Sequence, residues 1–67
     1  MFRWVDARGV TVADVAQTMR VAGSRPVILY IARVPGEQME KPRFACAKRL
    51  VEEWLRANKI AATPVAA

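Results

Sequence analysis

The side chains of this 67-residue chain that could do chemistry are mostly arginines. Eight of its eleven basic residues are arginine, and with six acidic residues the formal net charge is +5. Arginine carries a planar guanidinium group whose N–H donors match phosphate oxygens and the edge of guanine. This composition favours a polyanionic partner, usually nucleic acid, although ordinary surface charge for solubility is the other reading. Arg3, Arg8 and Arg20 could add to a basic surface, but no sequence pattern shows that they share a face.

Six residues are the candidates for contacts with duplex DNA. Arg25 and Arg33 border an apolar segment and could bind base edges or phosphates, or lie solvated beside a strand. Lys41 and Arg43 lie in a polar segment and could touch the phosphate backbone, or belong to a mobile charged loop. The complete set is Ser24, Arg25, Tyr30, Arg33, Lys41 and Arg43.

The sequence offers no group of residues suited to catalysis or to metal binding. It has no histidine, and Cys46 is its only cysteine, so neither an intrachain disulfide nor a zinc site is expected. Glu37 and Glu40 share a polar segment, and Glu52 and Glu53 diverge on a predicted helix, so neither pair suggests acid–base catalysis. The three glycines are isolated and make no phosphate-binding loop. We therefore expect a binding protein with no enzymatic activity, metal or cofactor.

The length predicts a single small domain, with a core over about residues 2–59 and a flexible tail at 60–67. A domain of this size buries only about 60% of its unfolded surface. Packing or self-association must therefore supply its stability. The longest apolar run, residues 27–32, is far shorter than the roughly 20 residues that cross a bilayer. With a lone cysteine and no signal-peptide pattern, we expect a cytoplasmic protein without a membrane partner.

Two segments are predicted to be the helices that position these residues. The first runs from about residue 12 to residue 22, with Thr11 suited to the N-cap, Asp14 to the first turn and Gly23 to the end. The second and clearer helix runs from about residue 45 to residue 58. Its apolar face consists of Phe44, Ala47, Leu50, Val51, Trp54 and Leu55.

The conformation of residues 26–34 decides between two folds. As a helix, this segment has one stripe of β-branched residues and places Pro26 in the first turn, where proline is tolerated. As a strand, it is apolar on both faces and belongs in the middle of a layered sheet. The rest of the chain offers few strands, so the strand interpretation calls for a dimer that completes the sheet. Residues 2–5 could likewise be a short strand or the start of a short helix.

Residues 11–16, Val21 and residues 29–31 together resemble the helix-turn-helix of the excisionase and MerR-like DNA-binding families. The stretch from Arg43 to Leu55 resembles the end of the same domain, where a short wing leads into a closing helix. The resemblance covers about residues 10–58. It implies a mainly α fold with a small β wing, a winged helix-turn-helix.

Three functions follow from these alternatives. The resemblance implies an excisionase-like protein or transcriptional regulator that binds duplex DNA through a helix around residues 25–33 and a basic wing around 37–43, and that contacts a recombinase. The alternative is an α+β module of order β-α-β-α with residues 26–34 as a strand, which would bind another protein as an adaptor or inhibitor, or form a homodimer. An RNA-binding module with arginines on a sheet face is a third, although aromatic residues are few. If the segment around Tyr30 is extended, the helix-turn-helix loses the helix that would contact the DNA bases.

Overall fold

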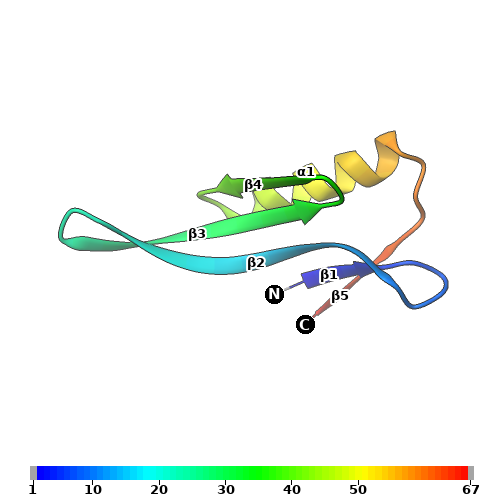
Figure 1. Cartoon of the computed structure of the whole chain (residues 1–67), viewed down its shortest axis with the longest axis horizontal. Helices are drawn as coiled ribbons and strands as arrows, with labels where there is room; N and C mark the ends of the chain where they lie inside the picture. The colour runs from blue at the N-terminus through cyan, green and yellow to red at the C-terminus, as the bar shows by residue number, and fades with distance from the viewer. Residues whose placement is uncertain (1, 67) are drawn as a thin grey trace.

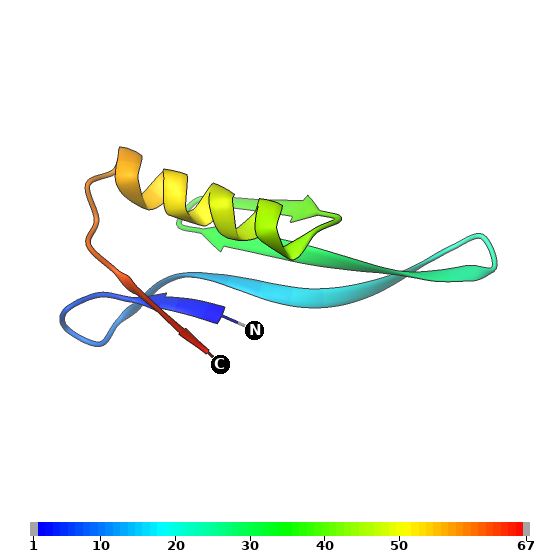
Figure 2. The ribbon, with the colours of Figure 1, turned by 180° about the vertical axis from the view of Figure 1, so that it is seen from behind.

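A computed structural model describes residues 2–66, which form a five-stranded antiparallel sheet and one helix. The elements are β1 (Phe2–Val5), β2 (Thr11–Ala22), β3 (Arg25–Val34), β4 (Glu37–Lys41), α1 (Phe44–Ala57) and β5 (Thr63–Ala66). The strand order is β4-β3-β2-β1-β5. The helix lies behind the sheet in Figure 1 and in front of it in Figure 2, so it covers one face only.

The mainly α, winged helix-turn-helix fold predicted from the sequence is wrong. The two segments expected to form the helix-turn-helix, residues 12–22 and 25–33, are the long strands β2 and β3. They pair over nine residues each and are joined by the two-residue turn Gly23-Ser24, in which Gly23 has a φ of 65°. Glycine adopts this left-handed conformation without a Cβ clash, which suits a tight hairpin. The hairpin ladder satisfies the backbone groups of both segments and overrides the local helix preference of residues 12–22.

Five other expectations can be compared with the structure, of which two are corrected and three hold. The predicted wing around residues 37–43 is in part the edge strand β4, which pairs with β3. Within the predicted tail at 60–67, residues 63–66 form β5 and pair with β1. The strand alternatives for residues 2–5 and 26–34 hold, and the helix predicted at 45–58 is confirmed as α1. The α+β alternative is therefore closer to the fold, although its order differs from β-α-β-α.

The core lies between α1 and the face of the sheet that α1 covers. Trp4 is only 1% exposed and is the largest side chain there, while three of the eight buried residues are alanines. Phe44 packs its ring against Phe2 and Tyr30, with ring centroids 5.3 and 5.8 Å apart. The buried set is Trp4, Ala13, Val15, Ala32, Val34, Ala47, Val51 and Leu55. Because strand residues alternate between faces, the residues between these core positions point to a face without a covering element.

Local hydrogen bonds define the turn after β1 and the end of α1. Asp6 holds the β1–β2 turn, because its Oδ1 accepts hydrogen bonds from the backbone N–H groups of Arg8 and Val10 at 2.9 and 3.0 Å. These bonds, with that from Val10 the strongest, hold the pKa of Asp6 below its usual value. Helix α1 ends at Ala57; two residues later Lys59 has a φ of 54°, and the N–H of Ile60 donates to the carbonyl oxygen of Leu55 at 2.9 Å. This is the Schellman arrangement, in which glycine is the usual left-handed residue.

The hairpin of β2 and β3 extends beyond the rest of the sheet. β1 pairs with β2 only as far as Val15, and β4 pairs with β3 only as far as Tyr30. Residues 16–22 and 25–29 therefore form a free two-stranded arm, which we call the ribbon. It projects at one end of the molecule in Figure 1 and accounts for the long dimension of a structure measuring 44 × 22 × 19 Å.

Candidate nucleic-acid interface

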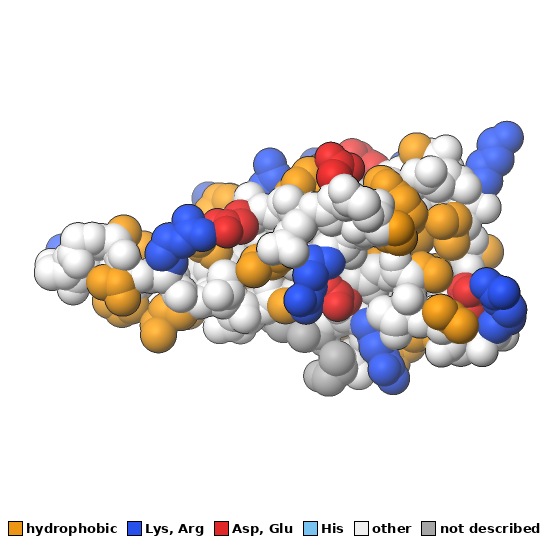
Figure 3. All heavy atoms as spheres, viewed as in Figure 1, with side chains coloured by type: hydrophobic (Ala, Val, Ile, Leu, Met, Phe, Trp, Pro, Cys, Tyr) orange, Lys and Arg blue, Asp and Glu red, His pale blue; other side chains and the backbone are white. Residues whose placement is uncertain are grey.

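The sheet face turned away from α1, which we call the open face, carries all four arginines of the strands. Phe2 and Trp4 pack toward α1, so Arg3 between them points to the open face. The same alternation along β2 and β3, with their cross-strand register, places the other three arginines on that face. These residues are Arg3, Arg20, Arg25 and Arg33. Figure 3 shows this side of the molecule, with basic side chains spread along its length.

An acidic side chain lies between two of the arginines at the wide end of the open face, which is the five-stranded end away from the ribbon. Asp14 is the cross-strand neighbour of Arg3 on β1 and of Arg33 on β3. Its Oδ1 accepts a hydrogen bond from Nε of Arg33 at 2.7 Å. The surface is hollowed here, because two shallow pockets of about 320 and 210 Å³ are both lined by Asp14 and Arg33. The row from Arg3 through Asp14 to Arg33 therefore borders concave surface that a ligand could enter.

A second ion pair lies farther along the face. Nη2 of Arg20 donates to Oε1 of Glu40 at 2.6 Å, and both side chains are more than one-third exposed. A guanidinium has five N–H donors, and this bond uses one of them. Arg3 and Arg25 make no ion pair within residues 2–66. The open face thus has a surplus of two positive charges, four arginines against Asp14 and Glu40, and most of its donors point to solvent.

The remaining side chains of the open face are small or aliphatic. Between the arginines lie Ala16, Thr18, Val27, Leu29 and Ile31. The aromatic residues lie elsewhere, since three belong to the helix-covered face of the sheet and two to α1. The five are Phe2, Trp4, Tyr30, Phe44 and Trp54. The open face therefore combines cations and methyl groups without an aromatic ring.

Two of the six residues predicted to bind DNA are strand residues whose side chains lie on the open face. Arg25 and Arg33 share the open face, eight residues or about 27 Å apart along β3. Ser24 is exposed in the hairpin turn beside Arg25. Tyr30 points to the other face and packs edge-on against Phe44. Tyr30 therefore lies on the face of the sheet opposite to Arg25 and Arg33.

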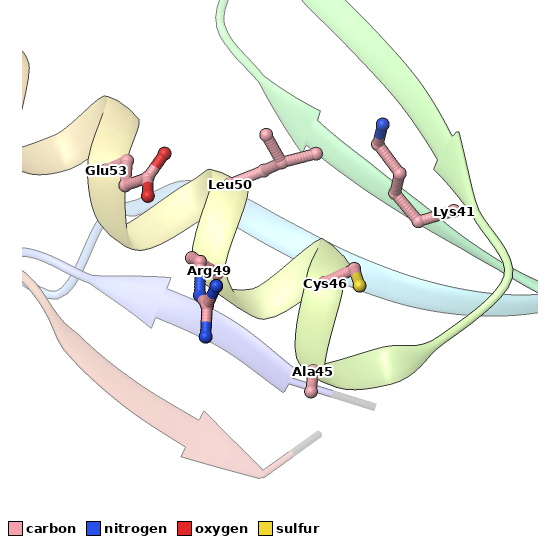
Figure 4. Close-up of a pocket in the computed structure, with 6 residues that line it drawn as sticks. All are labelled: Lys41, Ala45, Cys46, Arg49, Leu50 and Glu53. Atoms are coloured by element: carbon pink, nitrogen blue, oxygen red, sulfur yellow. The ribbon is translucent and has the colours of Figure 1, made fainter.

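The two predicted wing residues lie on the side of α1. Arg43 is exposed at the N-cap of α1, in an extended conformation. Lys41 ends β4 and borders a pocket of about 280 Å³ between this strand and the helix. Figure 4 shows Cys46 and Leu50 projecting from α1 toward the strand of Lys41. The pocket is lined by Lys41, Ala45, Cys46, Arg49, Leu50 and Glu53, and it holds no arrangement of a nucleophile with a base.

Sequence reasoning did not group Arg3 and Arg20 with the other two arginines. Their shared face depends on the register of β1 against β2 and of β2 against β3. One signal was present, since polar and apolar residues alternate with a period of two from Asp14 to Val21, except at Ala16 and Gln17. That alternation predicts a strand and would have placed Arg20 on the face of Asp14.

Comparison of the chain with models of protein families, with curated proteins and with solved structures returned no significant match. Among residues 2–66 there is no cluster of three metal-ligating side chains. In the same part of the chain, α1 falls short of the length and apolar character needed to cross a membrane.

Proposed function

We propose that this protein binds duplex DNA through the open face of its sheet. The observation that carries the proposal is the placement of every strand arginine on that one face. In the five-stranded part of the sheet, Arg3 and Arg33 face solvent because α1 buries the other face. Both faces of the ribbon are exposed, however, and Arg20 and Arg25 still share one of them. The helix-turn-helix resemblance, and the recombinase partner expected from it, depended on helices that the chain does not form, so neither is part of the proposal.

The ribbon has dimensions that suit the major groove. Strands in a sheet lie about 4.8 Å apart, and the groove of B-DNA, about 12 Å wide, admits a two-stranded ribbon. The ribbon is about 17 Å long, which corresponds to about five base pairs at roughly 3.4 Å each, while Arg33 lies beyond it in the five-stranded part of the sheet. The arginines would contact phosphates and guanine edges, while Val27 and Leu29 offer methyl groups to thymine.

The absence of aromatic rings from the open face, among the residues described, separates DNA from RNA as the target. Proteins that bind single-stranded nucleic acid stack the bases on aromatic side chains. Duplex RNA has a major groove too narrow for side chains to read. A cationic and aliphatic face is therefore better suited to double-stranded DNA.

Salt-dependent binding to duplex DNA, measured by fluorescence anisotropy, tests the proposal. With four phosphate contacts, the slope of log affinity against log salt is about −3.6, so affinity falls about 150-fold between 50 and 200 mM salt. The double variant Arg3→Gln/Arg25→Gln removes two contacts and lowers the slope to about −1.8. The control Arg49→Gln/Arg56→Gln removes the same charge from exposed positions on α1 and should keep most of the slope.

Three results would count against the proposal. No binding of duplex DNA at 50 mM salt would remove it. An equal loss of slope in both double variants would show that net charge, rather than the open face, drives binding. Tighter binding of duplex RNA or single-stranded DNA than of duplex DNA would show that the choice of target is wrong.

A further inference from the structure

The ribbon has a second face, on the side of α1, that the DNA-binding proposal leaves unused. The helix-side positions of the ribbon are Gln17, Met19, Val21, Pro26 and Ile28, all of them uncharged. Met19 is 66% exposed, Val21 69% and Ile28 49%. Both arginines of the ribbon point to the opposite face. An exposed apolar patch of this kind on a small protein marks an interaction surface.

The patch is exposed because the second layer of the fold stops short. α1 begins at Phe44, which packs against Tyr30, and the ribbon continues from there to Arg25. About 17 Å of ribbon is therefore left as a single layer, given a rise of about 3.3 Å per residue. Sheets are stable when their apolar face is packed against another layer. The helix-side face of the ribbon therefore lacks a covering layer about 17 Å long, and an apolar, uncharged surface would suit it.

We propose that the missing layer is the ribbon of a second copy, packed helix-side face to helix-side face about a two-fold axis near Met19. Each ribbon then supplies the length of layer that its partner lacks, because the two uncovered lengths are equal by symmetry. The packing brings no charges together, although each chain carries a net charge of +5. The open faces of both copies stay exposed on the outside of the dimer.

The dimer should be weak, because its interface is small. The five helix-side residues of each ribbon offer less than the roughly 800 Å² per partner of a standard interface. Sedimentation equilibrium at protein concentrations up to about 1 mM should therefore show a reversible increase from 7.5 kDa to twice this mass.

Two neighbouring substitutions provide a matched test. Val21→Glu and Ala22→Glu place the same charge at exposed, adjacent positions on opposite faces of the ribbon. Val21→Glu should raise the dimer dissociation constant at least about tenfold, whereas Ala22→Glu should leave it within about twofold. On DNA the order is reversed, because Ala22→Glu puts a carboxylate beside the arginines. The two proposals can therefore fail separately.

Cross-linking tests the same contact without adding a charge. In a Cys46→Ser background, Met19→Cys near the axis should form an intermolecular disulfide on oxidation, and Thr18→Cys on the open face should not. A wild-type chain that stays monomeric up to about 1 mM would overturn the dimer. Equal cross-linking at both positions, or assembly beyond two copies, would overturn the proposed face and its two-fold symmetry.

Discussion

Neutralising Asp14 should make this protein bind DNA more tightly. Asp14 is the cross-strand neighbour of Arg3 and accepts the 2.7 Å hydrogen bond from Arg33, so its negative charge opposes phosphate at the wide end of the open face. Asn has the same size and keeps an oxygen that can accept the bond from Arg33. Asp14→Asn therefore removes the charge while it preserves the shape of the site.

The expected gain follows from the repulsion between the Asp14 carboxylate and the DNA phosphates. If losing this repulsion is worth as much as one phosphate contact, the salt slope steepens by about 0.9, which raises affinity about eightfold at 0.1 M salt relative to 1 M. The cost in stability is small, because the Arg33 and Asp14 side chains are 51% and 33% exposed. Ion pairs at such exposed positions contribute only about 0.2–1 kcal/mol.

The assay is anisotropy with a labelled DNA duplex between 50 and 300 mM salt, beside urea denaturation to measure the stability of each variant. Glu52→Gln is the control, since it makes the same change in net charge at an exposed position of α1. It should leave the salt slope within about 0.3 of the wild-type value. If Asp14→Asn weakens binding, Asp14 instead holds Arg33 in its binding position. If Glu52→Gln gives an equal gain, DNA responds to net charge and the open face is not the site.

Two further predictions concern stability. Lys59→Gly relieves a left-handed lysine at the end of α1, where φ is 54°, and should stabilise the fold by about 1 kcal/mol, seen as a rise of roughly 4–8 °C in melting temperature; a lower melting temperature would contradict this account of the helix end. Asp6→Asn should reduce the acid sensitivity of the fold. A carboxylate whose pKa is lowered below 3.8 stabilises the folded state above that pH and loses this contribution as pH falls through its folded pKa. If the free energy of unfolding falls equally for variant and wild type from pH 6 to pH 2, the turn does not depend on this charge.

The ribbon connects the two proposals. Its open face would meet DNA and its helix-side face would meet a second copy, because strand residues alternate between faces. Because the helix-side faces pack against each other in this dimer, the two open faces point in opposite directions, and each is free to meet a separate segment of DNA. DNA binding through one face does not require the dimer, and the dimer does not require DNA.

The one helix within residues 2–66, α1, could be identified from the sequence by itself. Its apolar residues recur at helical spacing from Phe44 to Leu55, and this local pattern is the same in any tertiary context. The turn at Pro35-Gly36 also follows from a local pattern, because a proline followed by a glycine is typical of a tight turn, and in the structure Gly36 has a φ of 83°. The excess of arginine, which suggests a polyanionic partner, needs no structure at all.

The state of residues 12–22 was decided by tertiary structure. Thr11, Asp14, Ala16 and Met19 fit a capped helix by local preference, and such preferences amount to less than about 1 kcal/mol per residue. Pairing with β3, which lies in the next segment, satisfied the backbone of both strands at once. A strand depends on a partner that its own residues do not specify, so local pattern was a poor guide to it.

The shared face of the arginines was likewise beyond the reach of the sequence. A shift of one residue in strand register moves every side chain to the opposite face. Whether Arg3, Arg20 and Arg33 meet on one surface therefore depends on how β1, β2 and β3 pair, and that pairing is set by packing of the core residues against α1. Composition determined that the chain is rich in cations, and the register of the sheet decided where they gather.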